Sequence, residues 1–430
     1  MNNGSPATSS ARVKSEHRRI FYGWWVVLTS AVGIFWGVPV TVYSFSVFLR
    51  PVMQEFHVGR AAVSLGFTIM LFVSALCTPL TGWLLDRYGA RKVILSFTAL
   101  FGAVLLSNRA FSGSLWHLYF FYAGLGLSVH GMGPVPYGYV ISHWFDRRRG
   151  LALGLMMLGI GGGAVVMPSF AQRLITRFGW HAAYAILGAA AWLVAVPTVA
   201  VLLKERPRDI GLLPDGAQTL ESAVEMKAAA PQGVLAKEAW RTGTFWLLAC
   251  AFVLVSASVQ GCVVHLAAML SDRGINAQMA ALGSSLIGAA VLISRVGIGY
   301  LLDRVFAPRL AALCFASTAF GIGLLWLGGT KMAFVGAFLV GFGLGAEVDL
   351  IPYLTARYFG LRAFGKTYSS AFAAFALAGA LGPLIMGTAF DRTGSYRVPF
   401  MASVAATLLA GAMLSRLGAY RFRPMSHLVE

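Results

Sequence analysis

Long apolar runs, each about 20 residues or more, recur along almost the whole chain and constrain its fold more than any other feature. A helix needs about 20 mostly apolar residues to cross the hydrocarbon core of a bilayer. Because lipid leaves no partner for unpaired backbone groups, such runs predict an all-α membrane protein. We expect twelve spanning helices, at residues 23–49, 61–85, 93–112, 115–142, 151–173, 181–203, 243–270, 280–302, 309–328, 331–356, 366–390 and 396–417.

Composition supports a membrane protein and argues against a soluble one. The chain is 58% hydrophobic and 12% charged, whereas soluble domains have about 45–50% apolar and about 25% charged residues. A net charge of +18 would favour nucleic-acid binding in a soluble protein. Here the basic residues lie in short segments between apolar runs, as in cytoplasmic loops. We therefore expect the lipid bilayer as the surroundings and no nucleic-acid partner.

A single long polar segment divides the apolar runs into two groups of six. Lysine and arginine are concentrated in the segments that lie on the side of the N-terminus, which predicts that both termini are cytoplasmic. We expect a monomer in the inner (cell) membrane. The predicted parts are a cytoplasmic tail (1–19), an N-terminal six-helix bundle (20–203), a cytoplasmic linker (204–242), a C-terminal six-helix bundle (243–418) and a second cytoplasmic tail (419–430).

The two groups of runs also resemble each other in sequence. Three segment pairs occur in the same order: GWLLDRYGARK (82–92) with GYLLDRVFAPR (299–309), ISHWFDRRRGLALG (141–154) with TARYFGLRAFGKTYS (355–369), and TRFGWHAAY (176–184) with DRTGSYRVPF (391–400). An internal repeat of spanning helices is typical of secondary transporters, whose binding site lies near the midplane between the repeats. The sequence therefore predicts a transporter with a central site.

The first of these segments carries a loop motif with a specific charge pattern. GWLLDRYGARK resembles the G-x-x-x-D-R-x-G-R-K signature of the major facilitator superfamily, between helices two and three. A carboxylate at such a position pairs with an arginine or a helix N-terminus across the two halves, and so biases one conformation over another. The alternative is that these charges only anchor the helix end. The predicted gating residues are Asp86, Arg87, Arg91 and, in the second copy, Asp303 and Arg304.

A second motif, at residues 144–159, points to one family within this superfamily. WFDRRRGLALGLMMLG (144–159) is similar to the helix-five signature of the monocarboxylate transporter family. It departs from that signature at Gly150, Met156 and Leu158, where the family has alanine. The matching positions are the aromatic pair, the basic triplet, Ala152, Gly154 and Gly159.

Arg295 lies inside the run 280–302, where a charged side chain is costly. An arginine at the centre of a spanning helix costs about 2.5–3.5 kcal/mol, which marks it as a candidate functional residue. Its helical stripe, with Ser284, Gly288 and Gly299, suits a water-filled cavity better than lipid. The helix-eight arginine of the monocarboxylate transporters and the oxalate/formate exchangers binds the substrate carboxylate, so the resemblance implies this role for Arg295. A structural ion pair is the alternative.

Two acids lie within the run 331–356. Arg295 is eight residues before Asp303, and Asp349 is eight residues before Arg357. At 1.5 Å per residue both lie about 12 Å from the same membrane boundary. We hypothesise that Asp349 or Glu347 pairs with Arg295 when substrate is absent, and thereby couples proton binding to anion binding. The alternative for each acid is a hydrogen bond between packed helices.

Three weaker candidates share the predicted site. His130 titrates near neutral pH and lies beside two prolines that loosen its helix, which suits a proton relay. Tyr137 and Tyr353 lie near the depth of Arg295, where a hydroxyl can donate to a carboxylate. A satisfied buried histidine and aromatic packing are the simpler readings. Phosphate-binding loops, catalytic triads and metal-ligand spacings do not stand out, so we expect neither an enzyme nor a cofactor.

The function expected from these features is alternating-access transport of a small organic monocarboxylate with protons. Proton-linked relatives have an aspartate where this chain has Val291, and a lysine in helix one that is missing here. Helix eleven offers only Lys366, at its start. One intramembrane cation suits a monoanion better than a dianion, by charge matching. The alternatives are an organic-anion exchanger of oxalate/formate type, an exporter of hydrophobic compounds and a membrane sensor.

Overall fold

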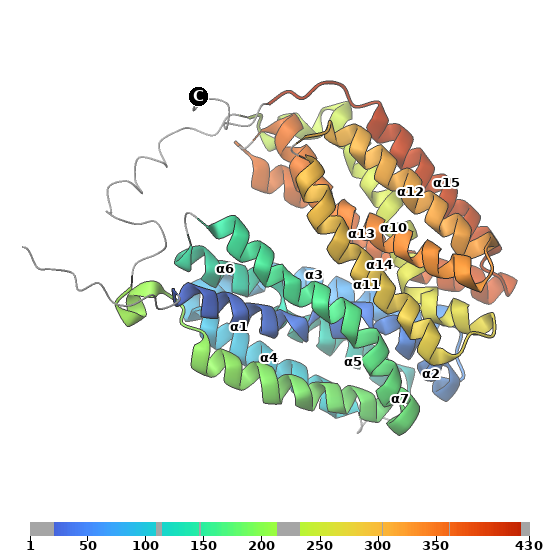
Figure 1. Ribbon diagram of the computed structural model, residues 1–430, viewed down its shortest axis with the longest axis horizontal. Coiled ribbons are helices and arrows are strands. Elements are labelled where there is room, and N and C mark those ends of the chain that lie inside the picture. Colours follow the sequence, from blue (N-terminus) through green and yellow to red (C-terminus); the bar gives the residue numbers. More distant parts are fainter. Residues whose placement is uncertain are drawn as a thin grey trace, which may run out of the picture.

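The computed structural model describes residues 21–108, 114–145, 148–212, 233–302, 304–360 and 362–422. Within these residues the regular structure is helical, apart from one isolated bridge between Gly233 and Gly360. Figure 1 shows two helical bundles side by side, the first half of the chain in blue to green and the second in yellow to red. The predicted all-α architecture of two bundles is confirmed.

Nine helical segments lie among the described residues of the N-terminal half, up to Leu202. They are α1 (Gly23–Phe35), the π-helical turn η1 (Pro39–Tyr43), α2 (Phe45–Phe56), α3 (Arg60–Tyr88), α4 (Ala90–Ser107), α5 (Leu115–Ser128), the 3-10 turn η3 (Val129–Met132), α6 (Pro134–Trp144) and α7 (Arg149–Leu202). Two short segments follow, η4 (Pro207–Ile210) and α9 (Ala236–Trp240). The C-terminal half consists of α10 (Gly243–Asp272), α11 (Ala277–Leu302), α12 (Ala307–Leu327), α13 (Thr330–Phe359), α14 (Phe364–Thr393) and α15 (Arg397–Ser415).

Ten helical stretches of the described residues are long and apolar enough to cross a membrane. One of them, in α7, contains two of the predicted spans, because the helix bends at Gly179, where φ is 78° and ψ is 166°. That backbone conformation favours glycine, which explains why the long helix turns there. A further predicted span, 115–142, is divided between α5 and α6. With these two adjustments the helices correspond to the twelve predicted spans.

Two of the spans in the N-terminal half are broken. The break at 129–133 lies just before Pro134, where the 3-10 turn η3 and the extended Gly133 separate α5 from α6. The sequence indicated this break through its two prolines. The first span is interrupted as well, at the π-helical turn η1, which the sequence analysis treated as continuous helix. Broken spanning helices expose backbone and side chains near a transporter's midplane, and π turns recur at functional sites.

The three repeated segment pairs occupy equivalent places in the two halves. Residues 82–92 join α3 to α4, and 299–309 join α11 to α12. Residues 141–154 join α6 to α7, and 355–369 join α13 to α14. The third pair lies at the bend of α7 and at the connection from α14 to α15. The repeat seen in the sequence is therefore a repeat of helical connections.

The two halves are joined at one end only, which we call the closed end, where α3 and α11 begin. Among the described residues, every hydrogen bond between the halves lies in that part of the bundle. Two are hydroxyl pairs, Ser46 with Ser284 and Ser169 with Ser285, each 2.9 Å apart. A third is donated by Thr68 to the carbonyl oxygen of Ala380 at 2.6 Å. The opposite end, where α3 and α11 finish, is the open end.

The hydroxyl pair between α7 and α11 gives a direct test of this arrangement. Cysteines in place of Ser169 and Ser285 should form a disulfide, because their hydroxyl oxygens lie 2.9 Å apart and disulfides need closely facing Cβ atoms. The bond should hold the closed end shut and stop transport in proteoliposomes, with recovery on reduction. The control pair is cysteines at Ser142 and Ser294, which lie in different halves. Transport that continues with Ser169→Cys and Ser285→Cys fully crosslinked would contradict the arrangement.

Candidate functional site

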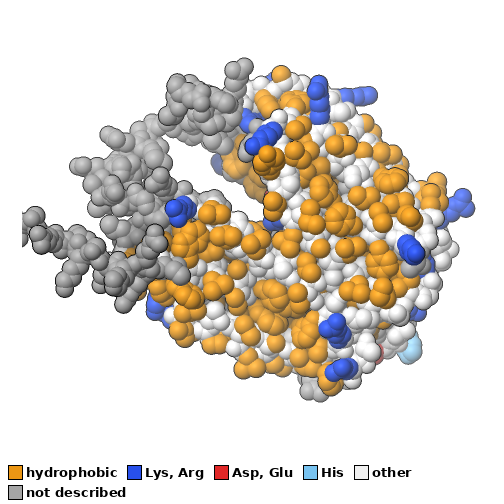
Figure 2. Space-filling model, viewed as in Figure 1, with side chains coloured by type: hydrophobic (Ala, Val, Ile, Leu, Met, Phe, Trp, Pro, Cys, Tyr) orange, Lys and Arg blue, Asp and Glu red, His pale blue; other side chains and the backbone are white. Residues whose placement is uncertain are grey.

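One face of α11, which carries Gly288, Arg295 and Gly299, was predicted to border a cavity. Its surroundings change along the helix. Near the closed end it packs on the N-terminal half: Gly288 lies so close to the backbone of Ala164 that a Cβ atom would clash, and Leu292 fills the space beside Gly161. Further along the same stripe, Gly299 has no atom within 4 Å of where its Cβ would be. The halves therefore separate between Leu292 and Gly299. Figure 2 shows the resulting cleft between the two bundles.

Arg295 lies on α11 where this separation begins. Its side chain is partly buried, and its Nε is buried without a hydrogen-bond partner among the described residues. It interacts electrostatically with Asp349 on α13 and with Tyr43 on the broken first span. No salt bridge within 4.0 Å links it to another described residue. The guanidinium is therefore near an acid but is not neutralised by direct contact.

The two acids of α13 have different surroundings. Asp349 is partly buried and interacts with Arg295, which agrees with the equal depth estimated from the sequence. Glu347 is fully buried, with 0% of its surface exposed, and neither of its carboxyl oxygens has a hydrogen-bond partner among the described residues. It lies within electrostatic reach of Tyr43. Of the two acids, Asp349 is the one within electrostatic reach of Arg295, but no salt bridge joins these two side chains.

Tyr43 is a residue of this site that the sequence analysis missed. It is the last residue of η1 and is 8% exposed. It interacts electrostatically with both Arg295 and Glu347, and so connects the N-terminal half to the charged groups of α11 and α13. The signal available in the sequence was the pair Gly37 and Pro39, which interrupts an otherwise continuous helix.

The hydroxyl groups of the two tyrosines predicted to bind substrate make different contacts. Tyr137 is completely buried in α6, and its hydroxyl lies against Gly33 of α1, where a Cβ atom would clash. Tyr353 donates to the carbonyl oxygen of Leu302 at 2.7 Å and accepts from Arg357 at 2.7 Å. Its hydroxyl therefore joins the ends of α11 and α13 near the open end.

His130 has its own partners away from Arg295. Its Nε2 lies 2.8 Å from the carbonyl oxygen of Ser74 and 3.3 Å from that residue's hydroxyl. Its ring lies edge-on to Phe97, with centroids 6.5 Å apart. These contacts, all within the N-terminal half, match the reading of a satisfied buried histidine.

A second histidine that the sequence analysis did not single out lines an open hollow. His143 and Tyr139 of α6 border a space of about 510 Å³ together with Gly82 of α3 and Leu153 of α7. The Nδ1 of His143 donates to the carbonyl oxygen of Tyr139 at 2.8 Å. This arrangement offers a titratable ring and a phenol in the N-terminal half, toward the open end.

The predicted gating cations lie at the open end and contact their own half. Arg87 stacks on Trp83 of the same helix at 5.3 Å, and Arg304 stacks on Tyr300 at 3.5 Å. Arg91 donates to the carbonyl oxygen of Ala200 on α7. Asp86 is on α3 beside Arg87, and Asp303 lies outside the described residues. None of the three arginines bridges the halves among the described residues, as expected for an end that is open.

The closed end is held by Arg60, at the start of α3. Its guanidinium is 5% exposed, forms a salt bridge with Asp272 of α10, and donates to the hydroxyl of Tyr396. It also stacks on Phe390 of α14 at 3.8 Å. All of these partners belong to the C-terminal half. We call the group formed by Arg60, Asp272, Tyr396, Phe390, Asp391 and His265 the Arg60 latch.

Asp391 and His265 complete the Arg60 latch. Asp391 of α14 caps α3 from the other half: its oxygens accept from the backbone nitrogens of Arg60 at 2.9 Å and Ala61 at 2.8 Å. A carboxylate at a helix N-terminus satisfies free amides and the positive end of the dipole. His265 Nδ1 is 3.1 Å from the Tyr396 hydroxyl, and its Nε2 is 3.0 Å from the carbonyl oxygen of Pro383.

The latch should control access from the closed end. Arg60→Gln removes the charge that pairs with the Asp272 carboxylate, and breaking a buried charged pair costs about 3–5 kcal/mol. A cysteine at Ser64, which is 0% exposed, should then react at least about tenfold faster with a membrane-impermeant maleimide, in protein lacking its four native cysteines. Arg273→Gln is the control, because the hydrogen bonds of Arg273 to described residues all go to carbonyl oxygens of its own half, those of Gly328 and Trp326. Equal rates in both variants would refute the latch.

Comparison with known proteins gives the family. The model of the Major Facilitator Superfamily matches residues 27–383. The chain belongs to this superfamily. The resemblance stated from the loop motif is therefore confirmed, and the chain is a multi-pass membrane protein of a transporter family.

Curated relatives narrow the relationship. The chain is 28% identical to human "Monocarboxylate transporter 11" over 378 residues, which is 83% of this chain and 75% of the relative. It is 28% identical to "Monocarboxylate transporter 13" of Rattus norvegicus over 405 residues, covering 91% of this chain and 87% of the relative. The protein is thus a superfamily member related to monocarboxylate transporters.

Solved structures share the fold at low sequence identity. The crystal structure of a D-xylose-proton symporter has a TM-score of 0.69 at 15% identity, covering 92% of this chain and 98% of the other. A bacterial homologue of the human lysosomal transporter Spinster, in an inward-facing and unoccupied conformation, has a TM-score of 0.68 at 18% identity, covering 92% and 97%. At these identities the likeness shows the major facilitator fold.

Proposed function

We propose that the protein carries a small organic monocarboxylate across the cell (inner) membrane by alternating access, together with protons. The single observation that carries the proposal is the guanidinium of Arg295. It lies where the cleft begins, without a direct salt bridge among the described residues, and within electrostatic reach of Asp349 and Tyr43. A guanidinium fork matches the two oxygens of a carboxylate, and a phenol can add a third hydrogen bond.

The charge balance favours one carboxylate on the substrate. Lys366, the other cation considered from the sequence, is exposed at the start of α14. A dianion would bring two negative charges to one guanidinium that already has an acid beside it, and burying the excess charge is costly. This balance supports a monoanion over oxalate exchange.

Proton coupling follows from the two acids of α13. Asp349 and the incoming carboxylate are both attracted to the positive charge of Arg295 and repel each other. Protonation of Asp349 removes its negative charge and so favours binding of the substrate carboxylate. Glu347 has no hydrogen-bond partner among the described residues, and an ionised carboxyl group is costly to bury in this way. Both acids are therefore candidates to carry a proton with the substrate.

The membrane orientation belongs to the same proposal. Both termini and the open end, with Arg87 and Arg304, face the cytoplasm, since lysine and arginine favour that side. The conformation described here is then inward-facing, with the Arg60 latch on the outer side. A reporter fused after Arg109 and found accessible from the cytoplasm would refute this orientation.

Substitution of Arg295 tests substrate binding. Arg295→Gln should lower uptake of labelled pyruvate into proteoliposomes at least about thirtyfold, because losing one partner of a buried charge pair costs about 2–5 kcal/mol. Arg295→Lys should retain part of the activity with a raised KM, since the charge remains and the fork is lost. Arg309→Gln, a surface cation near Phe306 of the same half, is the control. Normal uptake by Arg295→Gln would exclude Arg295 as the receptor.

The two acids are tested through pH dependence. Proton symport predicts that uptake rises as external pH falls, because more carrier is protonated before substrate binds. Asp349→Asn or Glu347→Gln, whichever removes the coupling proton, should flatten this dependence and uncouple pyruvate entry from proton entry, measured with an internal pH dye. Asp209→Asn, on the cytoplasmic η4, is the control. If both substitutions leave the pH profile unchanged while Arg295→Gln abolishes uptake, the coupling idea fails and the binding idea survives.

A further inference from the structure

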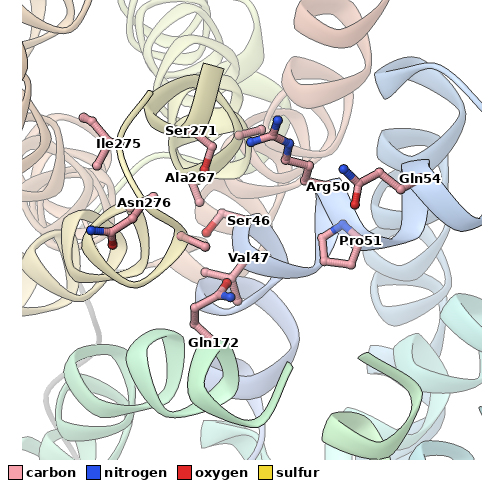
Figure 3. A pocket seen from close by; sticks show the side chains of 13 residues that line it. Ser46, Val47, Arg50, Pro51, Gln54, Gln172, Ala267, Ser271, Ile275 and Asn276 are labelled. Carbon is pink, nitrogen blue, oxygen red and sulfur yellow. The ribbon is translucent and has the colours of Figure 1, made fainter. Parts of the chain in front are cut away.

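A second cavity lies at the closed end, well away from Arg295. It has a volume of about 330 Å³ and lies between α2 and α7 of the first half and α10 and α11 of the second (Figure 3). Its lining ends at Ala280 along α11. The 15 residues from there to Arg295 correspond to about 22 Å of helix. The cavity is therefore separate from the proposed central site.

Among the described residues that line this cavity, Arg50 on α2 carries the only charged side chain. Arg50 is exposed and forms no hydrogen bond or salt bridge with any other described residue, in contrast to Arg60, which forms a salt bridge with Asp272. Figure 3 shows Arg50 and the amide of Gln54 on one side of the hollow, with Ser271 of α10 opposite. Gln172 of α7, which is 6% exposed, borders it from below. The described lining of the cavity thus combines a cation that has no direct carboxylate partner with several hydrogen-bonding groups and includes no acid.

This combination selects a small anion. A guanidinium binds a carboxylate through two parallel hydrogen bonds, and neighbouring amides and hydroxyls can orient it. The apolar wall, formed by Val47, Ala267 and Ile275, suits the carbon part of an organic acid better than an inorganic ion. A volume near the lower limit of ligand pockets restricts the occupant to small molecules.

The cavity also requires both halves of the protein. Arg50 and Gln172 belong to the N-terminal half, whereas Ser271 and Ile275 belong to the C-terminal half. Separation of the closed end would divide these groups between two surfaces. A ligand that binds only the joined arrangement stabilises it by its binding free energy.

We infer that this cavity is a second site for a small monocarboxylate, which binds from the aqueous side of the closed end and keeps that end shut. The choice of carboxylate rests on the proposed function. The site would report the concentration of the transported acid outside the cleft, so that a high concentration there slows opening toward it. Arg50 is the residue that holds the ligand's charge, and Gln54 and Ser271 position it.

Binding is tested with pyruvate on purified full-length protein that carries Arg295→Gln, so that the central site does not contribute. Pyruvate should still raise the temperature of unfolding of this variant, and methyl pyruvate, its neutral ester, should not. Adding Arg50→Gln should raise the pyruvate concentration needed for the same rise in unfolding temperature at least about tenfold, because a charge-assisted contact is lost. Adding Arg397→Gln, an exposed cation outside the cavity, should leave it unchanged. No effect of pyruvate on Arg295→Gln, or an effect insensitive to Arg50→Gln, would overturn the site.

Closure is tested with the cysteine at Ser64. In the Arg295→Gln background, pyruvate on the side of the closed end should slow its reaction with the maleimide, and Arg50→Gln should abolish this slowing. An unchanged or faster reaction would overturn the inference that the ligand holds the end shut. Transport by Arg295→Gln distinguishes the two proposals: if that variant carries pyruvate normally, the proposed function fails, whereas the Arg50 comparison still decides the second site.

Discussion

The structure depends on the fact that its two halves touch along only part of their length. At the closed end, small residues such as Gly288 bring α11 against α7, and hydroxyl pairs and the Arg60 latch add polar contacts. Helices in lipid associate through such close packing and hydrogen bonds, because apolar burial gives little driving force there. Where the contact stops, near Leu292, polar groups of both halves are left beside open space. The position of the candidate site is therefore set by where the helices part.

The chemistry of that site depends on incomplete neutralisation. A guanidinium in direct contact with a carboxylate is stable and has little left to offer a ligand. Arg295 has an acid within electrostatic reach but no direct salt bridge with a described residue, so its hydrogen-bonding capacity remains unused. Glu347 is likewise without a partner: it is a buried carboxyl group that forms no hydrogen bond with any described residue. The proposed exchange of an anion and a proton rests on this unfilled donor and this unfilled acid, both within electrostatic reach of Tyr43.

Features that repeat along one helix were predictable from the sequence, and contacts between distant segments were not. The apolar runs, the duplicated loops and the break before Pro134 follow from local residue patterns. Counting residues also predicted that Arg295 and Asp349 lie near each other, and Arg295 does lie within electrostatic reach of Asp349. The Arg60–Asp391 contact joins positions 331 residues apart, and no periodicity signals it. Tyr353 was placed by depth alone, but its rotation on α13 directs the hydroxyl to Leu302.

Three arginines along the interface differ in how their charges are satisfied. Arg60 is 5% exposed and has Asp272 in direct contact, with Tyr396 and Phe390 around it, so its charge is satisfied within the protein. Arg295 and Arg50 have no direct carboxylate partner among the described residues, and each borders open space between the halves. In a membrane protein an unsatisfied charge is expensive unless water or a ligand reaches it. The same residue type therefore joins the halves at Arg60, whereas at the other two positions its charge has no direct carboxylate partner among the described residues, which is the basis for proposing that anions bind there.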